Sequence, residues 1–163
     1  MVRRPTVRCK SQPPGTPGRA APYTAPVAER ITVPSDADPE DVLAAVTPGR
    51  RATDTRSAAA LLTRVTGARP RVWGTSILGF GRTTYTTADG VEHEWFALGL
   101  AGRKAAVTLY GLTYDDGDLD LIERLGPVRR GKGCLYVSRW DALDHAVLEE
   151  LVRRAWAAHH RPV

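Results

Sequence analysis

Hydrophobic and polar positions follow a helical period in the first part of the chain and a sheet-like period after it. Apolar side chains at i, i+3, i+4 and i+7 predict a helix over residues 55–66, capped by Thr53 or Asp54 and ended by Gly67. An earlier helix is predicted to open at Asp38, because an Asp followed by Pro and two acidic residues fits a helix N-terminus. Both helices are expected to pack on the sheet that follows them.

A change to β-branched and aromatic residues predicts a strand over residues 76–87. Asp89-Gly90 is a strong signal for a hairpin turn, so residues 91–100 are expected to form the returning strand. Another strand is predicted over residues 105–112 after a short turn. Sequential strands joined by tight turns indicate an antiparallel meander.

The remaining pattern predicts a short helix from Asp118, a buried strand over residues 134–137 and a last helix from about Asp141 to Ala158. Helices and strands do not alternate as they do in a parallel α/β sheet. We therefore expect an α+β fold, with a mainly antiparallel sheet flanked by helices.

Residues 71–81 mark the change from helical to sheet-like periodicity. Three glycines in this stretch allow positive φ angles or the close approach of another part of the chain. The bulky side chains of Trp73 and Phe80 are expected to anchor the helices to the sheet, while Ser76 could face a ligand. The stretch is thus predicted to be structural first, with a possible pocket wall beside it.

Composition divides the 163-residue chain into two parts. Residues 1–35 hold seven of the twelve prolines and a charge balance of +5, which equals the formal net charge of the whole chain. We predict a disordered Pro/Arg-rich tail here and a single domain over residues 36–163. The domain itself has no net charge, which disfavours a nucleic-acid-binding role, and the absence of a long apolar run disfavours a membrane span. A cytoplasmic protein is expected.

Two groups of acidic residues could bind a hard cation. The region after residue 114 does not fit the calcium-loop template, because, counted from Asp116, the sixth position is Leu121 where the template needs Gly and the twelfth is Pro127 where it needs Glu. Weak binding remains open for a set of carboxylates on the predicted hairpin and at the start of the short helix, namely Glu92, Glu94, Asp115, Asp116, Asp118 and Asp120. The simpler explanation of these acids is a favourable interaction with the helix dipole.

Lysine is rare, with three residues against twenty arginines, and the domain keeps it only at Lys104 and Lys132. Both lie beside turn glycines, where an ammonium group and backbone N–H groups could bind an anion together. Solvated turn lysines are the alternative, as are packing roles for the tryptophans. The candidate ligand-binding residues are Trp73, Ser76, Tyr85, Trp95, Lys104 and Lys132.

Four motifs carry a family resemblance: residues 71–81 (RVWGTSILGFG), 95–96 (WF), 103–110 (RKAAVTLY) and 131–137 (GKGCLYV). In this order they resemble the bacterial YdhG-like domain of unknown function, over about residues 41–158. The resemblance implies a frataxin-like sandwich. It also implies an intracellular iron chaperone, as in one branch of that family, with iron as cargo and an iron-acceptor protein as partner.

Two functional hypotheses follow, both non-enzymatic, because neither Ser76 nor Cys134 belongs to a recognisable nucleophile motif with a base. The first is an iron chaperone, which depends on the resemblance. The second is a module that binds a small molecule or an anion in a pocket lined by the tryptophan and lysine residues.

The iron hypothesis predicts that ferrous iron, titrated anaerobically into the domain without its tail, perturbs the NMR signals of the candidate carboxylates. Oxygen ligands of this kind suit a hard divalent cation. If near-millimolar iron leaves these signals unchanged, the chain is not an iron chaperone of this type.

Overall fold

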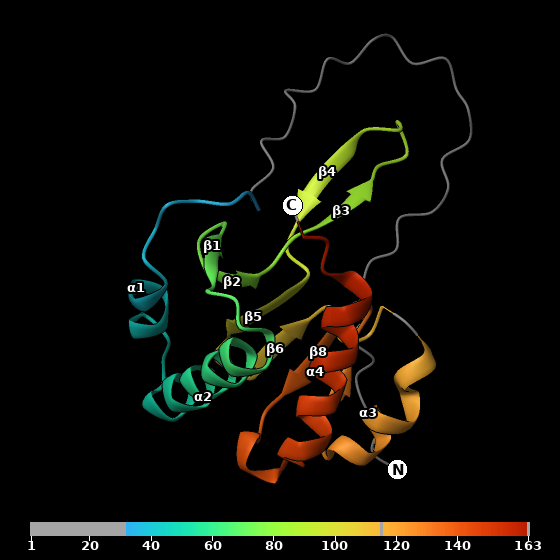
Figure 1. Ribbon diagram of the computed structural model, residues 1–163. Helices are drawn as coiled ribbons and strands as arrows, with labels where there is room; N and C mark the ends of the chain where they lie inside the picture. Colours follow the sequence, from blue (N-terminus) through green and yellow to red (C-terminus); the bar gives the residue numbers. More distant parts are fainter. Residues whose placement is uncertain (1–31, 115, 163) are drawn as a thin grey trace, which may run out of the picture.

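The computed structural model describes residues 32–114 and 116–162, which form an α+β fold with a mainly antiparallel sheet, as the sequence predicts (Figure 1). The predicted tail lies outside the described residues up to residue 31. In spatial order the main sheet contains β1 (Arg71–Trp73), β2 (Ile77–Phe80), β5 (Leu98–Gly102), β6 (Val107–Tyr110), β8 (Cys134–Val137) and β7 (Arg129–Arg130). Every neighbouring pair in this sheet is antiparallel.

A separate two-stranded ribbon projects from the main sheet, between β2 and β5 in the chain (Figure 1). It is formed by β3 (Thr83–Thr86) and β4 (Glu92–Trp95). The helices are α1 (Pro39–Ala44), α2 (Gly49–Thr66), α3 (Leu119–Leu125) and α4 (His145–His159), with short 3₁₀ turns η1 (Asp116–Asp118) and η2 (Trp140–Ala142). Helices α2 and α4 pack against each other and the sheet, and α3 packs beside α4.

Helix ends follow the predicted chemistry at several positions. The Asp38 carboxylate accepts the backbone N–H of Glu40 at the start of α1, and Gly67 ends α2 with a φ of 69°. Two predicted starts are wrong. Helix α2 begins at Gly49, before the predicted caps Thr53 and Asp54, and Asp54 forms a buried ion pair and does not cap the helix. Helix α4 begins at His145, after its cap Asp144, and not near Asp141 as predicted.

The two long strands predicted around the hairpin are each interrupted. Gly81, with a φ of 67°, ends β2, and the chain then leaves the main sheet to form β3. On the return, residues 96–97 separate β4 from β5, and the Ala97 N–H donates to the Phe80 carbonyl. The predicted turn at Asp89-Gly90 is confirmed, with Gly90 at a φ of 81°. The hairpin is therefore a projection of the fold, whereas the prediction made it a continuous part of the meander.

One face of the main sheet forms the hydrophobic core with the helices. Alternating strand positions point to this face, and the registers bring Val72, Leu78, Leu100, Leu109 and Leu135 into one row across the sheet. These side chains pack with buried helix residues, which include Ala58, Leu61 and Leu62 of α2 and Leu148, Leu151 and Val152 of α4.

The opposite face has an aromatic cover where two glycines lie side by side. Gly79 on β2 pairs with Gly99 on β5. The Phe96 ring lies against Gly99, and the Trp73 ring lies against Gly79 together with the Phe96 Cβ. Trp73 joins this cover, with its ring 5.5 Å from that of Phe96 and only 2% of its surface exposed. The expectation that Trp73 anchors the helices is therefore wrong, because its strand position points away from them. Phe80 does lie in the helix-facing core.

A buried ion pair attaches α2 to the ends of the strands. Arg51 and Asp54 form it at 3.2 Å, and the Arg51 guanidinium also donates to the carbonyl groups of Ala105, Val137 and Ser138. A buried guanidinium is tolerated where its charge is paired and most of its donors are bonded, and here both terminal nitrogens are bonded while Nε has no partner among the described residues. This contact fixes the start of α2 relative to β8 and to the loop before β6.

The first described residues cover the outer edge of β1. Ser35 N–H donates to the Val72 carbonyl, and Gly74 N–H donates to the Val33 carbonyl. This part of the predicted tail is thus paired with the sheet, because an edge strand leaves backbone groups to be satisfied. Along the described ranges, none of the helices has the length and apolar character needed to cross a membrane.

The glycine pair predicts a sensitive position. In Gly79→Ala, the new Cβ would lie 2.5 Å from a Trp73 ring carbon and 2.7 Å from Phe96 Cβ, so we expect a loss of about 1–3 kcal/mol in the free energy of unfolding. Chemical denaturation measures it. Gly49→Ala is the control, because no atom lies within 4 Å and helix propensity should leave it unchanged or more stable. Equal stability of the two variants would contradict this account of the cover.

Candidate functional site

A hollow lies between the projecting hairpin and the end of α4. It has a volume of about 550 Å³, which is in the range of small-molecule sites. We call it the aromatic pocket, and its lining residues are Thr83, Thr84, Tyr85, Trp95, Tyr114 and His159.

The hairpin supplies three of the aromatic side chains in or behind the pocket. Because side chains alternate along a strand and residues in register share a face, Tyr85, His93 and Trp95 lie on the same face of the ribbon. The centroid of the Tyr85 ring lies 5.4 Å from that of His93 and 5.8 Å from that of Trp95. The ring planes of Tyr85 and Trp95 are nearly perpendicular, at 86°. The two pocket rings are therefore held in a fixed corner.

Trp95 connects this corner to the aromatic cover of the sheet. Its ring lies 4.4 Å from that of Phe96 with the planes only 31° apart, and 5.6 Å from that of Trp73. Phe96 thus covers one face of the indole, which leaves the other face for the pocket. Packing of this kind fixes the position of Trp95 before any ligand arrives.

Tyr114 and His159 form the opposite side of the pocket, with ring centroids 5.3 Å apart. Partial burial raises the pKa of Tyr114 above its ordinary value, and a hydrogen bond from the Trp95 indole N–H, which can only donate, opposes the rise. The two sides of the pocket therefore influence each other.

The C-terminal end of α4 holds the base of the hairpin. The Trp156 and His160 rings stack at 4.0 Å, and a Cβ at Gly81 would meet both of them at 2.5–2.6 Å. His160 Nδ1 accepts the backbone N–H of Arg82 at 3.2 Å, and the Arg161 N–H donates to the Arg82 carbonyl. Residues on either side of His159 thus fix the end of the helix against the hairpin.

The six candidate ligand-binding residues do not share one pocket. Tyr85 and Trp95 line the aromatic pocket, and Trp73 packs behind Trp95. Ser76 and Lys104 lie at a hollow of about 240 Å³ beside α1, where Ser76 Oγ accepts a hydrogen bond from Arg103 at 2.8 Å.

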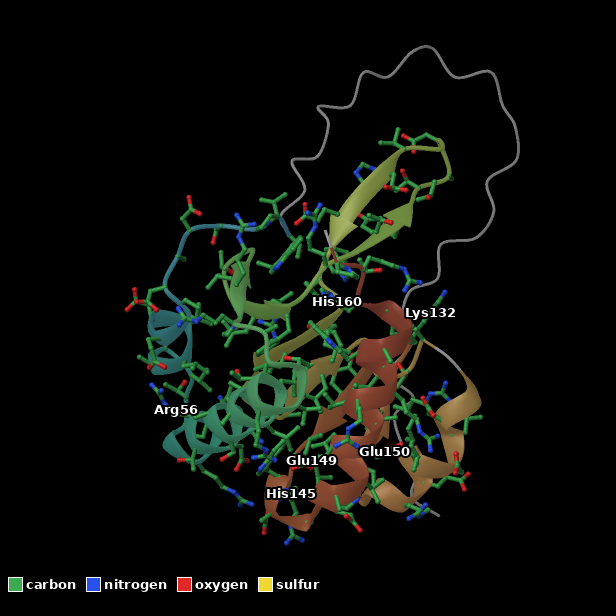
Figure 2. The ribbon with its side chains drawn as sticks, viewed as in Figure 1. Arg56, Lys132, His145, Glu149, Glu150 and His160 are labelled. Carbon is green, nitrogen blue, oxygen red and sulfur yellow. The ribbon has the colours of Figure 1, made fainter. Side chains whose placement is uncertain are left out.

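Lys132 lies apart from both of these hollows. It belongs to the exposed loop before β8, and its side chain extends outward from that loop (Figure 2). Trp73 and Ser76 line a further hollow of about 200 Å³, and Ser76 also lines the hollow of Lys104. The structure therefore brings some of the candidates together, but Trp95 and Lys132 do not join them.

The candidate metal ligands also fall into separate places. Glu92 and Glu94 lie on the ribbon face opposite Trp95, where Glu94 pairs with Arg82 at 3.3 Å. Asp118 pairs with Arg154 at 3.0 Å, and Asp120 is exposed on α3. Within residues 32–114 and 116–162, no three His, Cys, Asp or Glu residues are grouped so that they could hold a metal ion.

The absence of a metal-binding group does not apply in full to two of the candidate metal ligands. Asp115 lies outside the described residues, and Asp116 is described only as part of the 3₁₀ turn η1.

Cys134 has a tyrosine as its nearest polar side chain, with its thiol 3.1 Å from the Tyr136 hydroxyl. The hydrogen bond between the two groups favours the protonated phenol and is the main cause that raises the pKa of Tyr136, and the nearby guanidinium of Arg129, 4.4 Å from the ring centre, opposes it. A phenol that stays protonated cannot take up a proton from the thiol. Tyr136 is therefore not suited to act as a base for Cys134.

Sequence reasoning missed Tyr114 and His159 as pocket residues. Tyr114 lies in a loop after β6, and His159 is at the end of the last helix, where spacing gave no metal or acid–base motif. A large aromatic residue in an otherwise polar loop was the one available signal for Tyr114. For His159 the sequence has none, because only the folded chain brings the end of α4 to the hairpin.

Comparisons with known proteins identify no relative. No protein-family model, curated protein or solved structure matches this chain.

The pKa of Tyr114 predicts a pH dependence of stability. Because the folded-state pKa is raised above 10.0, its contribution to stability is complete below that pH and is lost as the pH rises through the folded-state pKa. Tyr114→Phe should therefore lose less stability between about pH 9 and 11 than the unchanged chain. Urea denaturation at several pH values in this range measures how steeply the free energy of unfolding falls with pH in each chain. The difference between the two chains at pH 7 corrects for the lost indole hydrogen bond. Parallel slopes would contradict the assignment.

Proposed function

We propose that this protein is a non-enzymatic binding module that takes up a small organic ligand in the aromatic pocket. The observation that carries the proposal is a pocket of about 550 Å³ whose aromatic walls are held in place by their own packing. Aromatic side chains with a few polar groups are typical of small-molecule sites, and preorganised walls reduce the entropy lost on binding.

The polar groups of the pocket fit an uncharged or weakly polar recognition site better than an anion site. Thr83, which is in register with Trp95, offers a hydroxyl group, and Tyr114 offers a phenol. Lys104 and Lys132 lie outside the lining. The small-molecule form of the binding hypothesis is thus favoured over the anion form.

The iron-chaperone function stays a prediction of the family resemblance. Its candidate carboxylates are in different parts of the fold, and Glu94 and Asp118 are each paired with an arginine. Arginine pairing competes with metal binding, because the same carboxylate oxygens would serve both. The geometry therefore supports the organic-ligand function more strongly.

Ligand screening by NMR tests the proposal with a built-in reporter. Compounds that enter the pocket should shift the indole N–H signal of Trp95 but not that of Trp140, which is buried beside His145 on another part of the fold. Tyr85→Ala should weaken such binding about fivefold, since the loss of one aromatic contact costs on the order of 1 kcal/mol. Trp95→Phe assigns the signal.

Two results would contradict the pocket as a binding site. One is a fragment library that leaves the Trp95 signal unmoved at millimolar concentration. The other is a set of bound compounds whose affinities are the same in Tyr85→Ala and in the unchanged chain.

A further inference from the structure

The walls of the aromatic pocket are arranged as a corner and not as a slot. The Tyr85 and Trp95 planes meet at 86°, and on the far side the Tyr114 and His159 planes meet at 73°. A flat ligand is best held between parallel rings, whereas a compact rounded group can touch several perpendicular ring faces at once. The shape of the walls therefore favours a compact group.

The electrostatics of the lining favour a cation. Among the described residues, the lining contains no Lys, Arg, Asp or Glu side chain, so its field comes mainly from the ring quadrupoles and from hydroxyl dipoles. The face of an aromatic ring is negative, and tryptophan and tyrosine attract cations most strongly. The nearest arginine of the hairpin base, Arg82, is paired with Glu94 at 3.3 Å on the other side of the ribbon.

The lining that the structure describes contains no carboxylate, and this favours a quaternary over a primary ammonium group. A primary ammonium group needs hydrogen-bond acceptors for its N–H groups, and leaving them unbonded is costly. A quaternary ammonium group has no N–H and spreads its charge over methyl groups, so aromatic faces alone can satisfy it. The site therefore suits a methylated ammonium better than lysine or arginine.

We propose that the aromatic pocket recognises a quaternary ammonium group, with Trp95, Tyr85 and Tyr114 as the rings that surround it. This inference rests on the proposed function and specifies its ligand class. The volume of about 550 Å³ exceeds what one such group fills, so the pocket has room for a ligand that carries the group on a larger molecule. The source is either a free choline-like molecule or a trimethyllysine side chain in a peptide.

A pair of isosteric probes tests the charge requirement in the full chain. Choline and 3,3-dimethyl-1-butanol have the same shape, but only choline is charged. Choline is expected to shift the Trp95 indole signal and to bind at least about fivefold more tightly than the neutral alcohol. A trimethyllysine amide, compared with its unmethylated lysine, forms the second arm, and preference for one arm identifies the source.

Matched variants separate ring recognition from other effects. Tyr85→Phe keeps the ring and should retain choline binding, whereas Tyr85→Leu keeps apolar bulk and should weaken it at least about fivefold. Tyr85 is 39% exposed, so both variants should fold, which near-UV circular dichroism checks. Lys132→Ala should leave choline affinity unchanged or raise it, because it removes a positive charge, and a loss of choline affinity there would contradict recognition of the ligand through its positive charge.

The outcomes distinguish this inference from the proposed function. Equal binding of choline and the neutral alcohol, with the Trp95 signal shifted by both, would overturn the cation requirement and leave the pocket as a binding site. No binding of any methylated ammonium, by a chain whose Trp95 signal responds to other fragments, would overturn the inference in the same way.

Discussion

The absence of two side chains, at Gly79 and Gly99, is the constraint on which the exposed half of this fold depends. The two residues are neighbours across β2 and β5. Gly99 leaves room for the Phe96 ring on the sheet surface, and Gly79 leaves room for the Trp73 ring. Phe96 in turn supports Trp95, which lines the pocket with Tyr114. A chain of contacts thus runs from the backbone of the central sheet to the walls of the pocket.

The two faces of the sheet consequently have different tasks. The helix-facing side provides most of the apolar burial, and the buried pair of Arg51 and Asp54 fixes how α2 sits on it. The other side is covered by aromatic rings from the hairpin connection, which pack at defined angles. The helices stabilise the sheet, and the sheet positions the hairpin.

Much of the fold could be predicted from sequence because its signals are local. The cap at Asp38, the stop at Gly67 and the turn at Asp89-Gly90 each depend on a few neighbouring residues. The division of the long strands could not be predicted in this way. It depends on Gly81, where the close packing of Trp156 and His160 comes from a helix far along the chain.

The candidate site shows the same limit more strongly. Tyr85 and Trp95 are recognisable because they share one hairpin, and the register set by the turn places them on the same face of it. Tyr114 and His159 join them only through the tertiary structure. Chemical similarity misled the choice of Lys104 and Lys132, since residues of one type beside turn glycines need not meet in space.

The two ends of the main sheet bear on self-association. Residues 33–35 occupy the backbone groups along β1, and the other end is β7, a strand of only two residues, both arginines. Open strand edges are the usual templates for pairing between protein molecules, and short or charged edges resist it. Exposed apolar surface favours association between molecules, and the protected edges of the main sheet limit association through its backbone groups.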